Sequence, residues 1–486
     1  MANYLLSVGM EVHAELNTAS KMFCRCQVGF GGEPNTRVCP ICIGLPGTLP
    51  VPNKHAIDLV LRMALALNCK VAPYSVFHRK NYFYPDLPKG YQVSQYGETN
   101  PIGYHGWLDV PLTSGGTKRV KIARVHLEED TGKLLHLPSG GTGVDYNRAG
   151  VPLMEIVTAF PPDIESAEEA RDYCNQLRQI MVYLGVCDGK LEEGSMRCEP
   201  NVSVRLDGAE KYGTKSEIKN LGSIRSVFLG VEFERKRQIA VLDGGGVVEQ
   251  ETRGWNDSNE TSFAMRKKEA ENDYRYFPDP DLCPMTFTEP RIEEARAALP
   301  ELPLAKKQRY VEVFGLSEYD AGVLTAERAW AQYFETCTQA GGDPKSICNW
   351  MNGDFARLLN ESGQTIDPEA GREQSKVSVN HLVELTKLIE RGTISGKIAK
   401  TIFEDMFVSG EMPAALVEKS GMTQIADTGA IEAFASEVIA ENAAIVEKFK
   451  SGQENVMGFL VGQLMKKSQG RANPQLAQEI LRNLIG

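Results

Sequence analysis

The chain has 486 residues, of which 42% are hydrophobic and 24% are charged. This is the composition of a globular protein with room for about two or three domains, each with its own core. The formal net charge of −11 argues against broad coating by nucleic acid, although it leaves room for a local basic face. The first residues, MANYLL, contain no basic segment followed by an apolar run. No later window approaches the roughly 20 uncharged apolar residues of a membrane span, so we expect a cytoplasmic protein.

The first predicted strand comprises residues 8–15, VGMEVHAE, in which polar and apolar side chains alternate. Alternation with period two places Glu11, His13 and Glu15 on one face of a strand and the apolar residues on the other. Carboxylates that flank an imidazole can bind Mg²⁺, Mn²⁺ or Zn²⁺, and their oxygen atoms favour the harder ions. A half-buried strand with a solvated polar face would show the same alternation.

Four of the eleven cysteines follow in a segment rich in Gly and Pro: Cys24, Cys26, Cys39 and Cys42. In a chain without signs of secretion, thiols or a metal site are expected rather than a disulfide framework. The C-x-C and C-x₂-C pairs suit four thiolates that close a tetrahedral Zn²⁺ site. We therefore expect a structural zinc ion that holds the loop 24–42 together, with four free thiols as the alternative.

Residues 55–70 have apolar side chains at helical spacing and predict a helix that faces the core. In residues 79–96, RKNYFYPDLPKGYQVSQY, aromatic rings then interleave with Arg79, Lys80 and Lys89. Such a segment can stack a nucleobase or an unpaired RNA end while its cations meet phosphate. The same rings can instead form an aromatic core under a loop.

A second alternating stretch, residues 124–130, places His126, Glu128 and Asp130 on one face of a strand. If this strand lies near residues 8–15 in an antiparallel sheet, the two polar faces form one acidic patch that also carries imidazoles. Massed carboxylates repel one another unless a cation lies among them. Two such strands therefore favour a metal site over a solvated face.

Glu155 stands alone in the apolar run of residues 150–157, GVPLMEIV. A carboxylate in apolar surroundings is strongly destabilised unless it is paired or bound to a metal ion. Metal ligation is one solution, and a buried ion pair with Arg148 is the other.

Eight blocks of sequence closely resemble the B subunit of the tRNA-dependent amidotransferase, and they span nearly the whole chain. Members of this family make Gln-tRNA(Gln) and Asn-tRNA(Asn) from mischarged Glu-tRNA and Asp-tRNA. The blocks are GMEVHAEL (9–16), RKNYFYPD (79–86), HLEED (126–130), DYNRAGVPLME (145–155), EGSMRCEPN (193–201), GTKSEIKN (213–220), DYRYFPD (273–279) and MGFLVGQLM (457–465).

The resemblance implies that ATP phosphorylates the side-chain carboxylate of the mischarged amino acid, and that ammonia then displaces phosphate to leave the amide. Mg²⁺ and cationic side chains absorb the charge that moves between oxygens in such a reaction. We predict that His13, Glu128 and Glu155 bind magnesium, with Glu11 at the same site or at a neighbouring one. These four are the predicted catalytic residues. The second choices as ligands are Glu15, Glu129 and Asp130.

Residues 194–220 are strand-like and carry four cations suited to ATP phosphates or to a developing acyl phosphate. These cations are Arg197, Arg205, Lys215 and Lys219, although a solvated strand face would explain any one of them. No G-x-x-x-x-G-K-[ST] sequence occurs, which excludes a P-loop as the nucleotide site.

Two further local signals concern secondary structure. Ser166 and Glu169 have the spacing of a capping box that opens a helix through about Leu184, and Gly185 follows as its end. The three glycines at residues 244–246 predict a hairpin turn.

The source of ammonia lies outside this chain, because it contains neither a G-x-S-x-G elbow nor the GGSS signature of the amidase family. The resemblance implies a heterotrimer with an amidase-type A subunit that hydrolyses glutamine and a small C subunit. It also implies a protected route for ammonia between the two sites.

The expected fold is α+β. A catalytic domain at residues 1–292, built around a largely antiparallel sheet of the glutamine synthetase type, precedes helical domains at residues 293–408 and 409–486. Prolines crowd residues 278–303, and the pattern is helical beyond them. Charges are mostly acidic in residues 411–446 and mostly basic in residues 447–486. The resemblance implies that this tail contacts the tRNA body while the acceptor end reaches the catalytic domain. A solvated helix face is the alternative for the tail.

Two other functions stay open at this point. A small-molecule carboxylate–amine ligase would use the same metal and carboxylates without a basic tail. A non-enzymatic tRNA-binding scaffold would need no acidic cluster.

Overall fold

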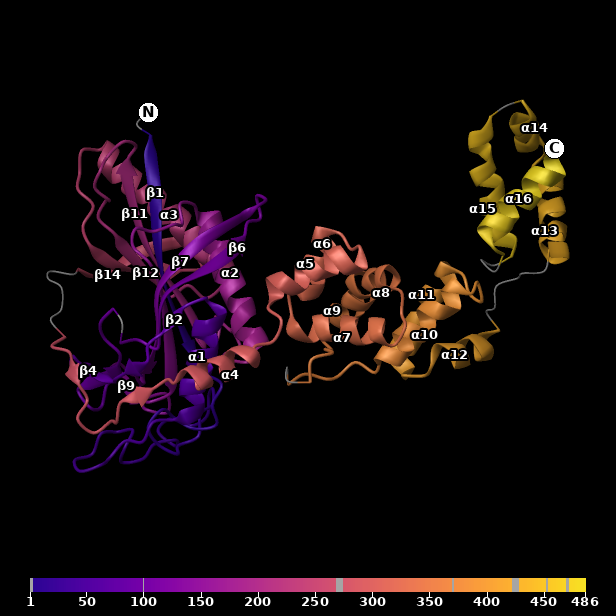
Figure 1. The fold of residues 1–486 in the computed structure, drawn as a ribbon. Coiled ribbons are helices and arrows are strands. Elements are labelled where there is room, and N and C mark those ends of the chain that lie inside the picture. The colour runs from indigo at the N-terminus through magenta and orange to yellow at the C-terminus, as the bar shows by residue number, and fades with distance from the viewer. Residues whose placement is uncertain are drawn as a thin grey trace. The chain divides into compact units, whose positions relative to one another are not determined.

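The computed structural model describes residues 3–98, 100–267, 274–368, 371–421, 428–451, 453–468 and 472–486. The chain divides into two compact units, Met1–Leu304 and Ala305–Gly486. Strands belong to the first unit, and the second is helical (Figure 1). Within the described ranges, no helix combines the length and the apolar character needed to cross a membrane.

A nine-stranded sheet forms the frame of the first unit, in the order β14-β13-β12-β11-β1-β10-β7-β6-β2. Its neighbouring strands are antiparallel except β12 and β13, which run parallel. The prediction of a largely antiparallel sheet in the N-terminal part is therefore confirmed. The strands are β1 (Tyr4–Glu15), β2 (Lys70–Val71), β6 (Gly103–Pro111), β7 (Thr117–Glu129), β10 (Pro152–Thr158), β11 (Met196–Leu206), β12 (Ser216–Lys219), β13 (Glu251–Asn256) and β14 (Thr261–Lys267).

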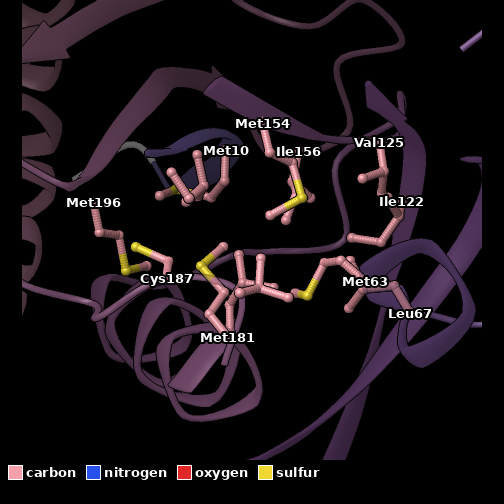
Figure 2. Close-up of a cluster of buried hydrophobic side chains, with 14 of the residues drawn as sticks. Met10, Met63, Leu67, Ile122, Val125, Met154, Ile156, Met181, Cys187 and Met196 are labelled. Atoms are coloured by element: carbon pink, nitrogen blue, oxygen red, sulfur yellow. The ribbon is translucent and has the colours of Figure 1, made fainter. Parts of the chain in front are cut away.

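The alternation of β1 decides which face of the sheet is buried. Met10, Val12 and Ala14 are almost completely buried, whereas the intervening polar residues are partly exposed. Figure 2 shows Met10 gathered with Met63 and Met181, which belong to the helices on that side of the sheet. Burying each such side chain contributes about 1.5–3 kcal/mol relative to exposure. A one-residue slip of β1 would reverse both faces, so the apolar residues fix its register.

Three long helices accompany the sheet: α1 (Lys54–Ala66), α2 (Ala167–Leu184) and α3 (Ile224–Asp243). The helix predicted from Ser166 is confirmed, because the hydroxyl of Ser166 accepts a hydrogen bond from the backbone N–H of Glu169 at 3.1 Å. Gly185 ends that helix with a φ of 66°, a left-handed conformation that suits glycine. The hairpin predicted at residues 244–246 is wrong. Gly244 instead caps α3, with its N–H donating to the carbonyl of Ala240.

Small sheets complete the first unit. β4 (His78–Asn81) pairs with β5 (Tyr91–Ser94) and with β15 (Phe277–Pro278), which brings the blocks 79–86 and 273–279 together. Asp273, the first residue of the second block, lies outside the described residues. β3 (Tyr74–Ser75) pairs with β16 (Met285–Thr286), and β8 (Lys133–His136) pairs with β9 (Thr142–Asp145). The helix α4 (Glu289–Ala297) ends this part of the chain.

The predicted helical C-terminal region is confirmed. It contains two separate apolar clusters, one formed by residues between 310 and 417 and one by residues between 431 and 485. The assignment of different functions to these parts stays a prediction. The helices are α5 (Pro303–Phe314), α6 (Glu318–Thr325), α7 (Arg328–Gln339), α8 (Pro344–Trp350), η1 (Met351–Phe355), α9 (Ala356–Ser362), α10 (Val379–Glu390), α11 (Gly396–Ser409), α12 (Pro413–Ser420), α13 (Thr428–Glu441), α14 (Ala443–Lys450), η2 (Glu454–Val456), α15 (Met457–Lys467) and α16 (Pro474–Ile485).

Candidate active site

A row of polar residues crosses the face of the sheet opposite to α1 and α2. His13 of β1 lies directly across from Glu155 of β10 on one side and from Arg197 of β11 on the other. Glu155 in turn lies across from His126 of β7. Directly opposed side chains in antiparallel strands are in contact distance. The strand β10 therefore lies between the two alternating stretches that the sequence singled out, and it inserts its lone carboxylate between their imidazoles.

Three of the predicted ligands converge at this row. The Nε2 atom of His13 lies 3.6 Å from Oε1 of Glu128 and 3.9 Å from Oε1 of Glu155. One ligand atom of each of the three residues lies within 4.8 Å of the others. An imidazole and two carboxylates on three strands suit a hard divalent cation such as Mg²⁺ or Mn²⁺. The donor set fits the predicted magnesium ion, whose ligation stays a prediction.

His126 was not among the predicted ligands, yet it balances the charge of this cluster. Its Nε2 atom lies 2.8 Å from Oε2 of Glu155 and 3.7 Å from Oε2 of Glu128. Burial lowers the pKa of His126, but Glu155 and Glu128 together outweigh burial and raise that pKa to about 9. Burial alone would raise the pKa of Glu155, and His126 instead holds it well below its ordinary value. The hydroxyl of Ser94 donates to Oε2 of Glu128 at 3.0 Å.

The alternative of an ion pair between Glu155 and Arg148 is wrong. Arg148 donates to the carbonyls of Thr131 and Gly132, at 3.0 and 2.8 Å, and its Nε atom lies 3.7 Å from Asp130. It is therefore turned toward the segment after β7 rather than toward β10.

Glu11 belongs to a neighbouring cluster rather than to the triad of His13, Glu128 and Glu155. Ligand atoms of Glu11, Glu199 and Glu217 lie within 4.8 Å of one another. Burial raises the pKa of Glu11, and the nearby carboxylates raise it further. The Nζ atom of Lys219 lies 2.7 Å from Glu199 and 3.2 Å from Glu217. Asn201 donates to Glu11 at 3.0 Å, so this second cluster is partly compensated by protein groups.

The second-choice ligands are engaged elsewhere. Asp130 accepts a hydrogen bond from Arg197 at 2.8 Å. Burial, and then the charge of Asp130, raise the pKa of Glu15 to about 7. Glu129 forms an ion pair with Lys89 and accepts the backbone N–H of Val93 at 3.0 Å.

The four predicted phosphate-binding cations are not equivalent. Arg197 is bonded to Asp130, and Lys219 pairs with two glutamates. The guanidinium carbon of Arg205 lies 4.2 Å from the centre of the Tyr212 ring, whereas Lys215 is exposed. Arg205 and Lys215 have no carboxylate partner among the described residues.

Comparison with known proteins decides the family. Residues 6–293 match the family model described as the GatB/GatE catalytic domain, and residues 332–485 match the model described as the GatB domain. The chain belongs to this family of amidotransferase B subunits. It is 50% identical over 479 residues to the aspartyl/glutamyl-tRNA(Asn/Gln) amidotransferase B subunit of Caldanaerobacter subterraneus, covering 99% of this chain and 98% of that one. The B subunits of Carboxydothermus hydrogenoformans and Geobacter sulfurreducens are 48% and 50% identical, with coverage of 98% or more on both sides.

This membership confirms the predicted family and the assignment to a ligase-type enzyme. An aspartyl/glutamyl-tRNA(Asn/Gln) amidotransferase that has a B subunit has further subunits. The activity of the B subunit is therefore part of a multi-subunit enzyme that acts on tRNA.

Sequence reasoning missed several polar residues around the triad of the protein. Glu199 and Asn201 alternate with Arg197 in one strand, so the period-two signal used for β1 could have found them. The aromatic segment 79–96 offered Lys80 as a phosphate contact, not as a neighbour of the triad. Lys80 reaches the triad because β5, its partner strand, contacts β7. Burial opposes the charge of Lys80, but Glu128, Tyr276 and Glu155 together raise its pKa above the ordinary value.

The cysteine-rich loop brings four thiols together. The Sγ atoms of Cys24, Cys26, Cys39 and Cys42 lie within 4.8 Å of one another. A hydrogen bond from Cys24 lowers the pKa of Cys42 to about 4, which favours a thiolate. Lys21 is 1% exposed, and its Nζ atom lies 3.6 Å from the sulfur of Cys42. The donor set fits the predicted structural zinc ion, whose presence stays a prediction.

Proposed function

We propose that this chain provides the site at which ATP activates the side-chain carboxylate of Glu-tRNA(Gln), Asp-tRNA(Asn) or both, for conversion to the amide. The observation that carries the proposal is the convergence of His13, Glu128 and Glu155 on one sheet face. The family membership supplies the substrate class. A glutamine synthetase-like fold for the first unit is part of the same proposal, because both reactions join ammonia to an activated carboxylate.

The substrate carboxylate requires activation because an oxide or hydroxide is a very poor leaving group. Phosphoryl transfer to the carboxylate would make phosphate the leaving group, and ammonia would then attack the carbonyl carbon. Bound Mg²⁺ would supply charge neutralisation for the phosphoryl oxygens. His13, Glu128 and Glu155 would hold that ion, and Glu11 would contribute from the neighbouring cluster.

The cationic side chains of the protein would bind two different groups, the phosphates of ATP and the substrate carboxylate. Lys219, Arg205 and Lys215 lie on or next to β11 and β12, where they would bind the phosphates of ATP. Arg197 would act through Asp130, to which it is bonded. Lys80 lies at the opposite side of the triad, near Glu128, where its ammonium would face the oxygens of the substrate carboxylate.

Ammonia would come from a glutaminase, because this sequence contains no amidase signature. We therefore propose a heterotrimer of this chain with an amidase-type A subunit and a small C subunit, located in the cytoplasm. The C-terminal residues 409–486 would bind the tRNA body. Lys467 cannot be counted fully as a phosphate contact, since its Nζ atom lies 2.7 Å from both Glu437 and Glu441.

The test uses the reconstituted complex with glutamine, Mg²⁺, labelled ATP and mischarged tRNA, and follows phosphate release and the amino acid on the tRNA. We expect ATP cleavage that requires mischarged tRNA, together with Gln-tRNA or Asn-tRNA as product. ATP cleavage without a tRNA requirement would favour a small-molecule carboxylate–amine ligase. Absence of any cleavage would favour a non-enzymatic tRNA-binding scaffold.

A further inference from the structure

A chain of aromatic rings lies next to the triad, at the ends of the strands β4, β5 and β15. The rings of Tyr96 and Tyr276 are stacked, with centroids 4.2 Å apart and planes 14° from parallel. Tyr276 meets Tyr274 edge-on at 6.0 Å, and Tyr274 meets Tyr82 at 5.8 Å. Two blocks of sequence nearly 200 residues apart thus build one contiguous aromatic cluster.

These rings are not a hydrophobic core. None of the four tyrosines is fully buried, and Tyr96 is 54% exposed although Tyr276 covers one of its faces. A core cluster would bury its rings against aliphatic side chains. An accessible ring beside a stacked partner is instead what a planar ligand needs.

The cluster is tied to the triad by two contacts. Ser94 of β5, two residues before Tyr96, donates to Glu128 at 3.0 Å. Lys80 of β4 has its Nζ atom 5.0 Å from the centre of the Tyr274 ring, and its charge interacts with Glu128 and Glu155. The tyrosines are therefore anchored beside Glu128 and Glu155, the carboxylates of the triad.

We infer that this cluster, formed by Tyr82, Tyr96, Tyr274 and Tyr276, stacks the terminal adenosine of the mischarged tRNA. The inference rests on the proposed function, because it assumes that the aminoacyl end reaches the triad. The aminoacyl group and the adenine leave the terminal ribose on opposite sides. With the side-chain carboxylate held at the triad, the amino acid and the ribose would together span the distance to the base, beside the tyrosines. Stacking of an unpaired base on aromatic side chains is a common mode of RNA recognition.

ATP also contains an adenine that could stack on the tyrosines. The order of the strands distinguishes the position of ATP from that of the tRNA end. Lys219 and Arg205 lie on β12 and β11, which follow β1 on one side of the row. The tyrosines lie with β5, which contacts β7 on the other side. ATP phosphates and the aminoacyl end would thus approach the triad from opposite directions, as an in-line transfer to the carboxylate requires.

The test measures steady-state kinetics of the complete complex with Tyr96→Ala and Tyr276→Ala. We expect the KM for mischarged tRNA to rise about tenfold, while the KM for ATP changes less than about twofold. Tyr96→Phe and Tyr276→Phe retain the ring and should behave like the wild type. Tyr74→Ala removes a tyrosine of similar exposure, 53%, away from the cluster and serves as the matched control.

A second measurement detects stacking directly. A tRNA that ends in 2-aminopurine should lose fluorescence on binding to the wild-type complex and much less on binding to Tyr96→Ala. A raised KM for ATP with an unchanged KM for tRNA would assign the cluster to the adenine of ATP and overturn the inference. Unchanged values for both substrates, with equal quenching, would overturn it as well. Failure of the wild-type complex to couple ATP cleavage to mischarged tRNA would instead refute the proposed function.

Discussion

Two groups of carboxylates on the same face of the sheet balance their charge in different ways. In the triad, Glu155 pairs with the imidazole of His126, a type of side chain that can release its proton when a metal ion binds. Asp130, just after the end of β7, is bonded to Arg197 and lies close to Arg148, and both arginines keep their charge. Crowded carboxylates therefore do not by themselves make a metal site. A metal ion can replace the proton of an imidazole, but it cannot replace the permanent positive charge of an arginine.

The largest effect should come from breaking the triad. Replacing Glu155 with Ala removes a central carboxylate, and the loss of amide formation should exceed the roughly 10- to 100-fold cost of changing a group outside the ligand set. Glutaminase activity of the complex should persist. Both activities are measured on the reconstituted enzyme, with the exposed Glu192→Ala as control. Amide formation at the wild-type rate in Glu155→Ala would exclude this carboxylate from the site.

The second cluster offers an intermediate case, since Lys219 already compensates part of its charge. We expect Glu217→Gln to lower kcat/KM for ATP by roughly 10- to 100-fold, a smaller loss than in the triad. ATP saturation curves with mischarged tRNA in excess provide the measurement. A loss as complete as that of Glu155→Ala would mean that the two clusters act as one centre.

The cysteine-rich loop extends the comparison to a site whose charge is balanced by Lys21. Cys42→Ser should remove bound zinc and lower the Tm by roughly 5 °C or more, because a structural metal contributes directly to folding. Zinc content by mass spectrometry and thermal unfolding check this expectation. The matched control is Cys283→Ser, which changes an exposed thiol outside the cluster. Equal zinc content in the two variants would contradict the assignment.

The smallest effect concerns Glu15, whose neighbour Asp130 is paired with Arg197. Its pKa is raised from 4.5 to about 7 in the folded protein. The folded state therefore binds the proton more tightly, and the resulting stabilisation is complete below pH 4.5 and lost as the pH rises through about 7. Glu15→Gln should flatten this dependence by roughly 1–3 kcal/mol.

Urea denaturation at pH 5, 6, 7 and 8 measures that difference. The exposed Glu192→Gln should follow the wild-type curve. A Glu15→Gln curve parallel to the wild type over the whole range would show that Glu15 titrates alike in the folded and unfolded states.

Local sequence patterns predicted the ligand residues of the site better than the polar residues that surround them. The alternation of β1 and of residues 124–130, together with the isolation of Glu155 in an apolar run, identified three residues that do converge. Other polar neighbours come from pairings that no local pattern encodes. Ser94 and Lys80 reach the triad only because the small sheet contacts β7.

Two predictions were wrong: the ion pair between Glu155 and Arg148, and the hairpin at residues 244–246. In both cases a short stretch of sequence was used to predict a contact that depends on the tertiary structure. Arg148 is seven residues from Glu155 but lies in the turn before β10, where carbonyl groups take up its donors. The glycines at residues 244–246 do break regular structure, yet what they end is a long helix, packed against β11. Propensity marks where an element stops and leaves open which kind of element it was.

The position of β1 at the centre of the sheet has a consequence for synthesis of the protein. Its hydrogen-bonding neighbours are β10 and β11, and at about 5–20 residues per second the ribosome needs about 10–40 s to pass from the end of β1 to the end of β11. Until β10 has been made, neither edge of this strand has its native partner, and until β11 is complete one edge stays unpaired. The nascent chain thus passes through an aggregation-prone stage in which chaperone binding would protect the strand that carries His13.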